Sequence, residues 1–347
     1  MIHFESDYTE GAHPNILNKL ISSNMEQTKG YGEDPYCEHA RELIREACGN
    51  QDLAVHFLVG GTQTNTTVIS SILRPYQGVL SAATGHINCH ETGAIEATGH
   101  KVLPLISEDG KITAKQVREY YKEHWADSSH EHVVQPGMVY ISHPTENGTT
   151  YHKEELAELY NVCKELEIPL FIDGARLGYA LAAEGNDLSL VELAANCDIF
   201  YIGGTKVGAL FGEAIVISNK ALQKDFRYHM KQRGGMLAKG RLLGLQFETL
   251  FTDNLYQEIS AHAVIQAMRI RDAFAKKGYQ FLYDSKTNQQ FPILPIHLLD
   301  YLGENYSYSF WAKVDETHHA VRFCTSWATK VGNVDALLKD IEEFHKK

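Results

Sequence analysis

An acid and a lysine each follow an apolar run, at two successive places along the chain. Leu170-Phe171-Ile172 ends on Asp173, and Gly174 after it permits a sharp exit from a strand. The next apolar run, residues 198–202, leads through Gly203-Gly204-Thr205 into Lys206, 33 residues after Asp173. Taken alone, Asp173 could be a helix cap or loop acid, and Lys206 a surface lysine. Together they form a specific pattern.

That pattern suits pyridoxal phosphate (PLP), a cofactor that needs both groups. A carboxylate beside its pyridine nitrogen keeps that nitrogen protonated, so that the ring can accept electrons from a substrate carbanion. A lysine amine holds the cofactor covalently, as a Schiff base, and later returns to release product. We therefore predict that Asp173 and Lys206 are catalytic and hold PLP, with the pKa of Lys206 lowered by partial burial.

A phosphate site is predicted where Val59-Gly60-Gly61-Thr62 passes from a strand into a helix. Glycines let the backbone approach closely, and amides at a helix start suit a dianion. The same residues could form only a tight turn, since neither a Walker loop nor a dinucleotide fingerprint is present. Thr205 could add a hydroxyl, and the basic run 231–233 could add charge, from this or a neighbouring subunit, or lie in a solvated loop.

The segment from Thr84 to Gly93 contains His86, His90 and Glu91 just after a predicted strand. A histidine there could stack on the cofactor ring or act as an acid or base near neutral pH. A structural role is the alternative for a lone histidine, but here two imidazoles and a carboxylate share one ligand-facing loop. Glu91 would be either their partner or a helix-start acid.

Short apolar runs alternate with amphipathic stretches from about residue 40 onward. The expected strands are 54–59, 79–82, 101–105, 138–142, 170–173, 199–202 and 214–218. The expected helices are 64–73, 113–124, 154–166 and 188–194. This order predicts an α/β domain with a mainly parallel seven-stranded sheet, in which ligands bind at the carboxyl ends of the strands.

The pattern changes after about residue 250. A long helix is expected over 255–277, then strands near 290–296, 306–311 and 320–325, and a last helix over 334–345. We predict three parts: an N-terminal segment, residues 1–40, that packs with the small domain and at a dimer interface; a large cofactor-binding domain, residues 41–250; and a small α+β domain, residues 251–347.

Composition narrows the class of protein. With 32 Lys+Arg against 44 Asp+Glu, the formal charge is -12, which argues against a nucleic-acid or anionic-membrane partner. No apolar stretch is long enough to span a bilayer, and the N-terminus lacks the features of a signal peptide. The six cysteines show no C-x-x-C spacing, so we expect reduced thiols in a cytoplasmic protein. The histidine clusters lack H-E-x-x-H spacing, and no metal site is expected.

The chain resembles the L-threonine aldolase and aromatic β-eliminating lyase group of fold type I PLP enzymes. The resemblance covers essentially the whole chain, in the order of the family's motifs. These motifs are Phe4-Glu5-Ser6-Asp7, Tyr31-Gly32-Glu33-Asp34-Pro35, Gly61-Thr62-Gln63-Thr64-Asn65, His86 with Glu91, Ile172-Asp173-Gly174-Ala175-Arg176, Lys206, Gly234-Gly235-Met236 and Val321-Arg322-Phe323.

The resemblance implies a role for each matching residue. Lys206 would form the covalent link, Asp173 would pair with the pyridine nitrogen, and His86 would stack on the ring. Gly61 and Thr62 would hold the phosphate. Arg176 would lie beside both the cofactor and the substrate carboxylate, with Ser6 and Arg322 also around that carboxylate. Arg322 could grip it through two bonds or instead form an ion pair within the small domain.

Further implications concern the partner subunit and the departures from the family. Tyr31 would reach the site from a second copy, so a homo-oligomer, a dimer or tetramer, is expected. Thr205 stands where the family usually has serine. The basic phosphate ligand would be His229, Lys231 or Arg233, with Arg233 our candidate, and a loop histidine proposed as a base aligns near His132.

The predicted reaction is cleavage of L-threonine, L-allo-threonine or a related β-hydroxy amino acid to glycine and an aldehyde. A base would remove the β-hydroxyl proton, and His86, His132 or a water that they hold are the candidates. A β-eliminating lyase or an aminotransferase on the same scaffold is the alternative, because both would use Lys206 and Asp173. A non-catalytic binding protein of this fold is the alternative from another class.

Overall fold

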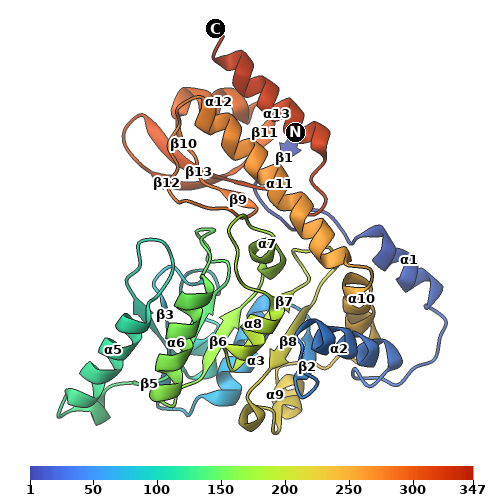
Figure 1. Ribbon diagram of the computed structural model, residues 1–347, viewed down its shortest axis with the longest axis vertical. Helices are drawn as coiled ribbons and strands as arrows, with labels where there is room; N and C mark the ends of the chain where they lie inside the picture. The colour runs from blue at the N-terminus through green and yellow to red at the C-terminus, as the bar shows by residue number, and fades with distance from the viewer. Residues whose placement is uncertain (347) are drawn as a thin grey trace.

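A seven-stranded sheet forms the centre of the larger of two bodies in the computed structural model, which describes residues 1–346 (Figure 1). The strands follow the spatial order β2-β8-β7-β6-β5-β3-β4. Their bounds are β2 Ala54–Leu58, β3 Gln77–Ala82, β4 Lys101–Leu105, β5 Gln135–Ser142, β6 Leu170–Asp173, β7 Ile199–Gly203 and β8 Glu213–Ile217. Only β8 runs antiparallel to its neighbours. The predicted α/β class with a mainly parallel seven-stranded sheet is therefore confirmed.

Both faces of this sheet are buried. Successive residues of a strand point to opposite faces, and in β5 Met138 and Tyr140 enter one hydrophobic cluster while Val139 and Ile141 enter another. The strands read as continuous apolar runs because helices cover both faces, as is usual for parallel sheets.

Helices surround the sheet and connect its strands. They are α1 Pro14–Ser22, α2 Pro35–Ala47, α3 Gly61–Ile72, α4 His86–Cys89, α5 Ala114–Ala126, α6 Lys153–Glu165, α7 Leu177–Leu181, α8 Leu190–Ala195, α9 Phe226–Gln232 and α10 Arg241–Phe251, with short 3-10 turns η1 Glu96–Thr98, η2 His130–His132 and η3 Lys220–Leu222. Helix α2 starts where Asp34 accepts a hydrogen bond from the Cys37 amide (2.8 Å), with Pro35 at its first position. Helices α1, α2, α9 and α10 were not predicted.

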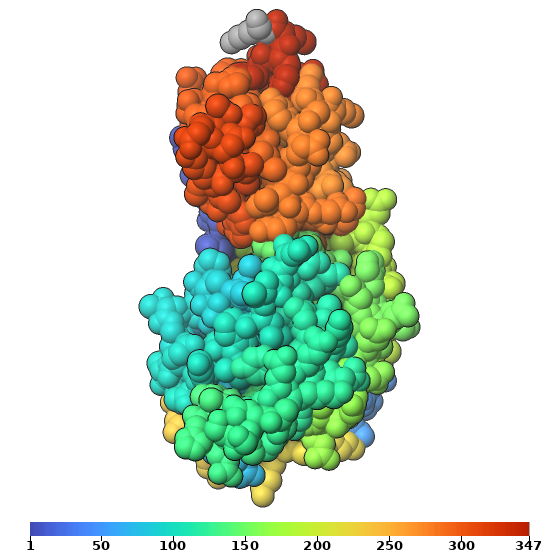
Figure 2. Space-filling view, turned by 90° about the vertical axis from the view of Figure 1, so that its left-hand side faces the viewer, coloured from blue at the N-terminus to red at the C-terminus, as the bar shows by residue number. Residues whose placement is uncertain are grey.

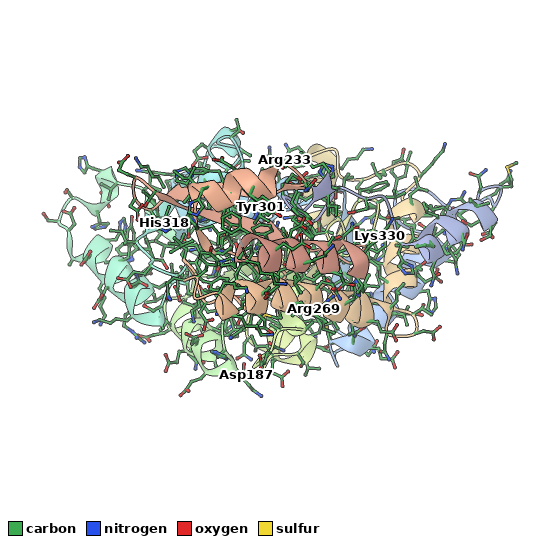
Figure 3. All side chains as sticks on the ribbon, turned by 90° about the horizontal axis from the view of Figure 1, so that it is seen from above. Asp187, Arg233, Arg269, Tyr301, His318 and Lys330 are labelled. Carbon is green, nitrogen blue, oxygen red and sulfur yellow. The ribbon has the colours of Figure 1, made fainter. Side chains whose placement is uncertain are left out.

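The smaller body contains the C-terminal part of the chain. It comprises the helices α11 Leu255–Lys276, α12 Ile296–Gly303 and α13 Val331–Phe344 and the strands β9 Gln289–Gln290, β10 Ile293–Pro295, β11 Tyr306–Ser307, β12 Ser309–Lys313 and β13 His318–Cys324. Seen from above, α11 and α13 lie side by side on its outer side (Figure 3). The predicted strand 290–296 is interrupted because Pro292 has no amide to donate, and Ile296 already begins α12.

The N-terminal segment belongs to both bodies. Strand β1, Ile2–His3, pairs with β11, and Phe4 lies in the hydrophobic cluster of the smaller body. Helix α1 instead packs on α10 of the larger body. Figure 2 shows the two bodies stacked along the long axis, with N-terminal residues in dark blue beside the upper one and at the waist. The divisions at residues 40 and 250 stay predictions, and α2 already begins before the first.

Three general properties bear on function. Over residues 1–346, no helix is long and apolar enough to cross a membrane. The six cysteines are all free thiols. The described residues contain no group of three or more His, Cys, Asp or Glu side chains that could hold a metal ion.

Candidate active site

Asp173 is the last residue of β6, and α7, the next helix along the chain, lies beside the smaller body (Figure 1). The Asp173 side chain receives four hydrogen bonds. Oδ1 accepts from the Tyr201 hydroxyl (2.5 Å) and the Ala175 amide (3.0 Å), and Oδ2 accepts from the Tyr140 hydroxyl (2.6 Å) and Asn65 Nδ2 (3.1 Å). Donors of this kind stabilise the ionised form of a carboxylate.

The charge of Asp173 follows from a competition between burial and these neighbours. Burial raises the pKa of Asp173, but the cation of His86 and the hydroxyls of Tyr140 and Tyr201 together lower it below its usual value. Asp173 is therefore a buried anion at neutral pH, which is the state needed to hold a proton on a pyridine nitrogen.

Lys206 lies in the loop between β7 and β8. Its carbonyl accepts a hydrogen bond from the Tyr179 hydroxyl (2.5 Å), which fixes the backbone of this residue. Burial and the nearby cation of Arg176 lower the pKa of Lys206, against the opposing effect of the carboxylates Asp7 and Asp173. A lysine with reduced proton affinity is nucleophilic, as the sequence analysis required.

Glu213 is a buried acid that holds the Lys206 loop through hydrogen bonds. Glu213 Oε2 accepts from the Gly204 amide (3.2 Å), and Oε1 accepts from the Thr205 hydroxyl (2.9 Å). The Thr205 hydroxyl also accepts from the Gly212 amide (3.0 Å), so it is held within the loop. Burial raises the pKa of Glu213 to about 8. Thr205 lines the same cavity as Lys206, and its contact with the cofactor stays a prediction.

The predicted phosphate turn opens helix α3. Gly60 is the N-cap residue and no side chain caps the helix, so the first amides of α3 are left for a ligand. A Cβ added at Gly60 would meet no atom within 4 Å, which means that the space in front of the helix start is open. With Gly61 and Thr62 beside it, this helix terminus suits a phosphate.

His86 begins α4 and belongs to a chain of polar groups that leads to Asp173. Its Nδ1 lies 2.8 Å from Glu91 Oε1, and Asn65 Nδ2 donates to the same oxygen (2.7 Å) as well as to Asp173. Burial lowers the pKa of His86, but the hydrogen bond to Glu91 and the charge of Asp173 give a net increase. Glu91 is therefore a partner of the imidazole, one of its two predicted roles.

Arg176 forms a buried ion pair that the sequence analysis did not foresee. Its Nε and Nη2 donate to the two carboxylate oxygens of Asp7, at 2.6 and 3.0 Å. Asp7 also accepts from Asn288 Nδ2 (2.9 Å). Arg176 lines the cavity, but its charge is balanced by Asp7, so it is a weaker candidate for the substrate carboxylate than an unpaired arginine.

Arg322 is such an arginine. It lies on β13, where Nη1 donates to Gln289 Oε1 (3.1 Å) and Nη2 donates to the Glu5 carbonyl (2.8 Å). Its Nε is buried without a partner, and within residues 1–346 it forms no salt bridge. The alternative of an ion pair within the small domain therefore does not hold. Ser6, also predicted near the substrate carboxylate, has a buried hydroxyl without a partner.

Most of these residues line a single cavity of about 300 Å³. Its lining comes from the carboxyl ends of β5, β6 and β7, the start of α3, α4 and the N-terminal segment. The lining residues are Tyr8, Val59, Gly60, Gly61, Thr62, His86, Ser142, Pro144, Glu146, Asp173, Ala175, Arg176, Tyr201, Thr205, Lys206 and Glu213. The volume suits a small-molecule ligand.

His132 does not line this cavity of its own chain, and its role as a base stays a prediction. It is exposed in η2, which precedes the amino end of β5, whereas Ser142 at the carboxyl end of β5 lines the cavity. An eight-residue strand separates the two ends by about 25 Å. Within one chain, His132 therefore does not reach the residues of the cavity.

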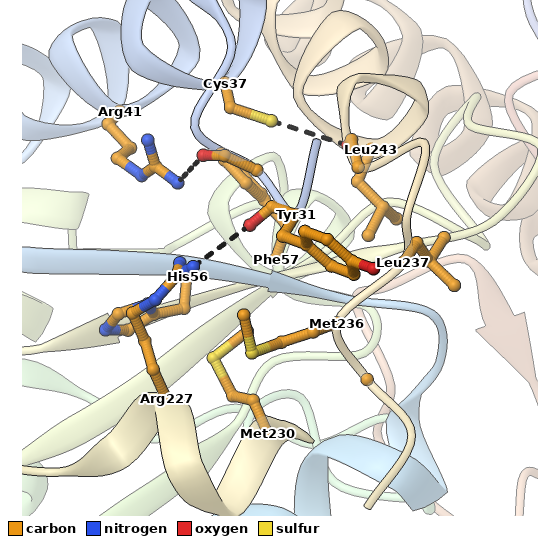
Figure 4. A pocket seen from close by; sticks show the side chains of 13 residues that line it. Tyr31, Cys37, Arg41, His56, Phe57, Arg227, Met230, Met236, Leu237 and Leu243 are labelled. Atoms are coloured by element: carbon orange, nitrogen blue, oxygen red, sulfur yellow. Dashed lines mark hydrogen bonds between the residues drawn. The ribbon is translucent and has the colours of Figure 1, made fainter. Parts of the chain in front are cut away.

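Tyr31 and Arg233 also lie outside the lining of the cavity. Tyr31 belongs to a second pocket with His56 and Met236, shown in Figure 4, where the Arg227 guanidinium donates to its carbonyl (3.2 Å). That pocket holds about 20 Å³, which is room for a water and not for a cofactor. Arg233 follows α9, and its Nε is buried without a partner.

Several residues of the site were missed by sequence reasoning. Tyr140 and Tyr201 look like core residues of their strands, although their alternation places them on the Asp173 face. Asp7 pairs with a residue 169 positions away in the sequence, so no local pattern indicates the contact. Glu146 lies in an irregular loop, where no periodicity predicts the direction of its side chain.

Comparisons with known proteins agree with this geometry. Residues 3–293 match the family described as beta-eliminating lyase. The low specificity L-threonine aldolase of Pseudomonas sp. (strain NCIMB 10558) is 30% identical over 341 residues, which are 97% of this chain and 96% of that protein. The threonine aldolase structure from Leishmania major has a TM-score of 0.96 and 42% identity over 99% of both chains.

A more distant structure shares the fold alone. The histidinol-phosphate aminotransferase from Clostridium acetobutylicum is 15% identical, with a TM-score of 0.74 over 100% of this chain and 99% of that one. The architecture and the cavity thus define a fold type I PLP enzyme. Within that class, the chain belongs to the beta-eliminating lyase family, the group to which the threonine aldolase resemblance pointed.

The residues of the cavity fit the cofactor of that class. A buried, ionised Asp173, a Lys206 of lowered pKa and an open helix start at Gly60 are the three features that the ring nitrogen, the aldehyde and the phosphate of PLP require.

Proposed function

We propose that this protein cleaves L-threonine, L-allo-threonine or a related β-hydroxy-α-amino acid to glycine and an aldehyde, with PLP as cofactor. The observation that carries the proposal is the single cavity in which Lys206, Asp173 and the open start of α3 meet. The threonine aldolases at 30% and 42% identity, aligned over almost the whole chain, support the choice of reaction.

Each predicted residue has a task in this proposal. PLP, when bound, supplies an electron sink for the pair released by the broken bond. Lys206 provides the amine that bonds to the cofactor, Asp173 holds the ring-nitrogen proton, and Gly61 with Thr62 holds the phosphate. His86 packs against the ring, fixed by its contact with Glu91.

The substrate carboxylate is assigned to Arg322, with Ser6 beside it. Arg322 has no carboxylate partner within residues 1–346, and Nε of Arg322 and Oγ of Ser6 are both buried without hydrogen bonds. A guanidinium that grips a carboxylate fixes the orientation of the bonds at Cα, which decides which of them breaks.

A β-eliminating lyase is the second candidate, because the matching family carries that description. It would release ammonia and a keto acid instead of glycine and an aldehyde, while an aminotransferase would give a keto acid without ammonia. The three reactions share Lys206 and Asp173, so only their products separate them.

The experiment is product analysis with L-threonine and L-allo-threonine. Wild-type protein loaded with PLP should release glycine and acetaldehyde, Lys206→Ala should release neither, and Lys164→Ala, which changes an exposed lysine of α6, should match wild type. Ammonia and keto acid without glycine would replace the aldolase by the lyase.

We further propose a homo-oligomer in which Tyr31 completes the active site of the partner subunit and Arg233 supplies positive charge near a phosphate. The exposed apolar side chains of Leu17, Ile21 and Met25, close in sequence to the exposed Tyr31, support a covered surface here. A cytoplasmic location is also proposed, and the six free cysteines support it.

A further inference from the structure

One carboxylate in the cavity has no task in the proposed function. Glu146 lies four residues after the end of β5 and lines the cavity together with Lys206 and His86. Its Oε1 accepts from the Ser142 hydroxyl (2.6 Å) and from the His86 amide (3.0 Å). Its Oε2 accepts no hydrogen bond from another residue within residues 1–346. One oxygen is thus anchored, and the other is left for a ligand.

The surroundings of Glu146 favour proton transfer. Burial raises the pKa of Glu146, the charge of Asp173 raises it further, and the Ser142 hydroxyl and the His86 cation partly oppose this increase. Tyr140, Tyr151 and Arg176 are the other ionisable groups that interact with Glu146. A carboxyl whose pKa moves toward neutrality is suited to acid–base catalysis.

The other carboxylates of the cavity and its histidine are already engaged. Asp173 receives four hydrogen bonds, and Glu213 is turned into the Lys206 loop, where it accepts from Gly204 and Thr205. His86 is held by Glu91, and its ring is assigned to the cofactor. Among the carboxylates that line the cavity, Glu146 is the one with an oxygen that accepts no hydrogen bond from another residue within residues 1–346.

We propose that Glu146 is the catalytic base that removes the proton of the substrate's β-hydroxyl group, an inference that rests on the proposed function. The O–H bond breaks, and the proton moves to Glu146. The oxygen forms a double bond to Cβ as the Cα–Cβ bond breaks, and PLP, when bound, would supply the sink for the released electron pair. The aldehyde leaves, Cα takes up one proton to give glycine, and Glu146 returns its proton to water, so the protons balance.

The test is Glu146→Gln in the PLP-loaded enzyme, with two reactions measured. Glutamine keeps the size of the side chain and an oxygen that can accept from Ser142 and His86, but it cannot take a proton. Loss of a general base lowers kcat for threonine cleavage by about 10²–10⁴-fold. Exchange of the glycine Cα proton in D₂O, followed by NMR, involves no β-hydroxyl group and should stay at the wild-type rate.

Two further variants complete the design. Glu155→Gln makes the same chemical change at an ion pair with Lys111 outside the cavity, and both reactions should be unaffected. Glu146→Asp keeps a carboxylate and should retain more cleavage than Glu146→Gln. The acid limb of the kcat/KM profile for cleavage, which reports protonation of the base, should disappear in Glu146→Gln.

The outcomes separate this inference from the proposed function. If Glu146→Gln cleaves threonine at the wild-type rate, or loses glycine exchange and the cofactor's visible absorbance to the same extent as cleavage, Glu146 is not the base. If the wild-type enzyme exchanges the glycine proton but releases no aldehyde from any β-hydroxy amino acid, the aldolase function fails, and the role of Glu146 falls with it.

Discussion

At the scale of single residues, the site depends on which charges are balanced within the chain and which are left for a ligand. Arg176 is neutralised by Asp7 through two hydrogen bonds, whereas the acceptors of Arg322 are neutral: Gln289, the Glu5 carbonyl and the Ser309 hydroxyl. Arg322 is half-buried and its Nε is buried without a partner, so a ligand anion would satisfy a donor that the chain leaves unpaired. We therefore expect Arg322 to bind the carboxylate of an amino-acid substrate.

Replacement of Arg322 by alanine tests this assignment. Loss of a hydrogen bond to a charged group costs about 1.5–3 kcal/mol, and each 1.4 kcal/mol is about tenfold in affinity. We expect KM for threonine to rise by about 10–100-fold, with PLP absorbance unchanged. Arg269→Ala, which breaks an ion pair with Asp335 on the outer side of the smaller body, is the control and should leave KM as it is. An unchanged KM in Arg322→Ala would move the carboxylate site elsewhere.

At the scale of elements, one side chain of the N-terminal segment joins the two bodies. Asp7 contacts Arg176, the N-cap residue of α7 in the larger body, and Asn288, next to β9 in the smaller body. Burial raises the pKa of Asp7, but Arg176 and Lys206 lower it to about 2. The folded state therefore favours the ionised form.

Asp7→Asn should lower the free energy of unfolding by about 3–5 kcal/mol near pH 7, because it leaves the Arg176 cation buried without a partner. The pKa of Asp7 is lower in the folded state than its ordinary value of 3.8, so the contribution is complete above about pH 4 and is lost as the pH falls toward 2. Urea unfolding from pH 7 to pH 2 measures it. The difference between wild type and variant should shrink below pH 4, and a constant difference would show that the ion pair is not its source.

The strands of the larger sheet could be predicted to within a few residues because each is mainly apolar, although β4 also contains Lys101 and Pro104. Helices α2 and α10 were not predicted, although Asp34 and Pro35 are start signals for α2. Helix α2 buries only small or isolated apolar side chains, such as Cys37 and Ala40, on a highly charged helix. It is held by contact with α10, where a Cβ on Gly244 would lie 2.4 Å from Cys37 Cα. The close contact between α2 and α10 exists only in the folded protein, so the sequence pattern of either segment alone does not predict it.

The same distinction separates the predicted from the missed residues of the site. Lys206, Asp173 and the Gly61 turn each follow a strand, so the rule for ligand sites at carboxyl ends places them together. Asp7 lies 169 residues from Arg176 in the sequence, and their pairing depends on how the N-terminal segment packs. His132 precedes a strand and so lies at the other end of the sheet, where the same rule does not place a ligand site.

At the scale of the whole molecule, the larger body supplies the cofactor cavity and the smaller one supplies Arg322. Tyr31 lies outside the lining of its own cavity, which leaves its predicted role to a second copy. Light scattering should give two or four times the chain mass of 39.0 kDa. A monomer at working concentrations would contradict the shared site.

Mixing two inactive variants tests the shared site itself. Tyr31→Ala removes the side chain that one subunit would lend, and Lys206→Ala removes the anchor that the other subunit keeps. Mixed oligomers contain one site with both residues intact, so threonine cleavage should return after unfolding and refolding together. If both residues act within one subunit, each mixed oligomer has a Lys206-deficient site and a Tyr31-deficient site, and the mixture stays inactive.

The most direct measurement concerns Lys206. Borohydride reduction of the PLP-loaded protein fixes the cofactor to the lysine that holds it, and peptide mass spectrometry then locates the label. The label should lie on Lys206, should be absent in Lys206→Ala, and should be prevented when borohydride follows removal of the cofactor. A label on another lysine, or a colourless protein that takes up no PLP, would contradict the account.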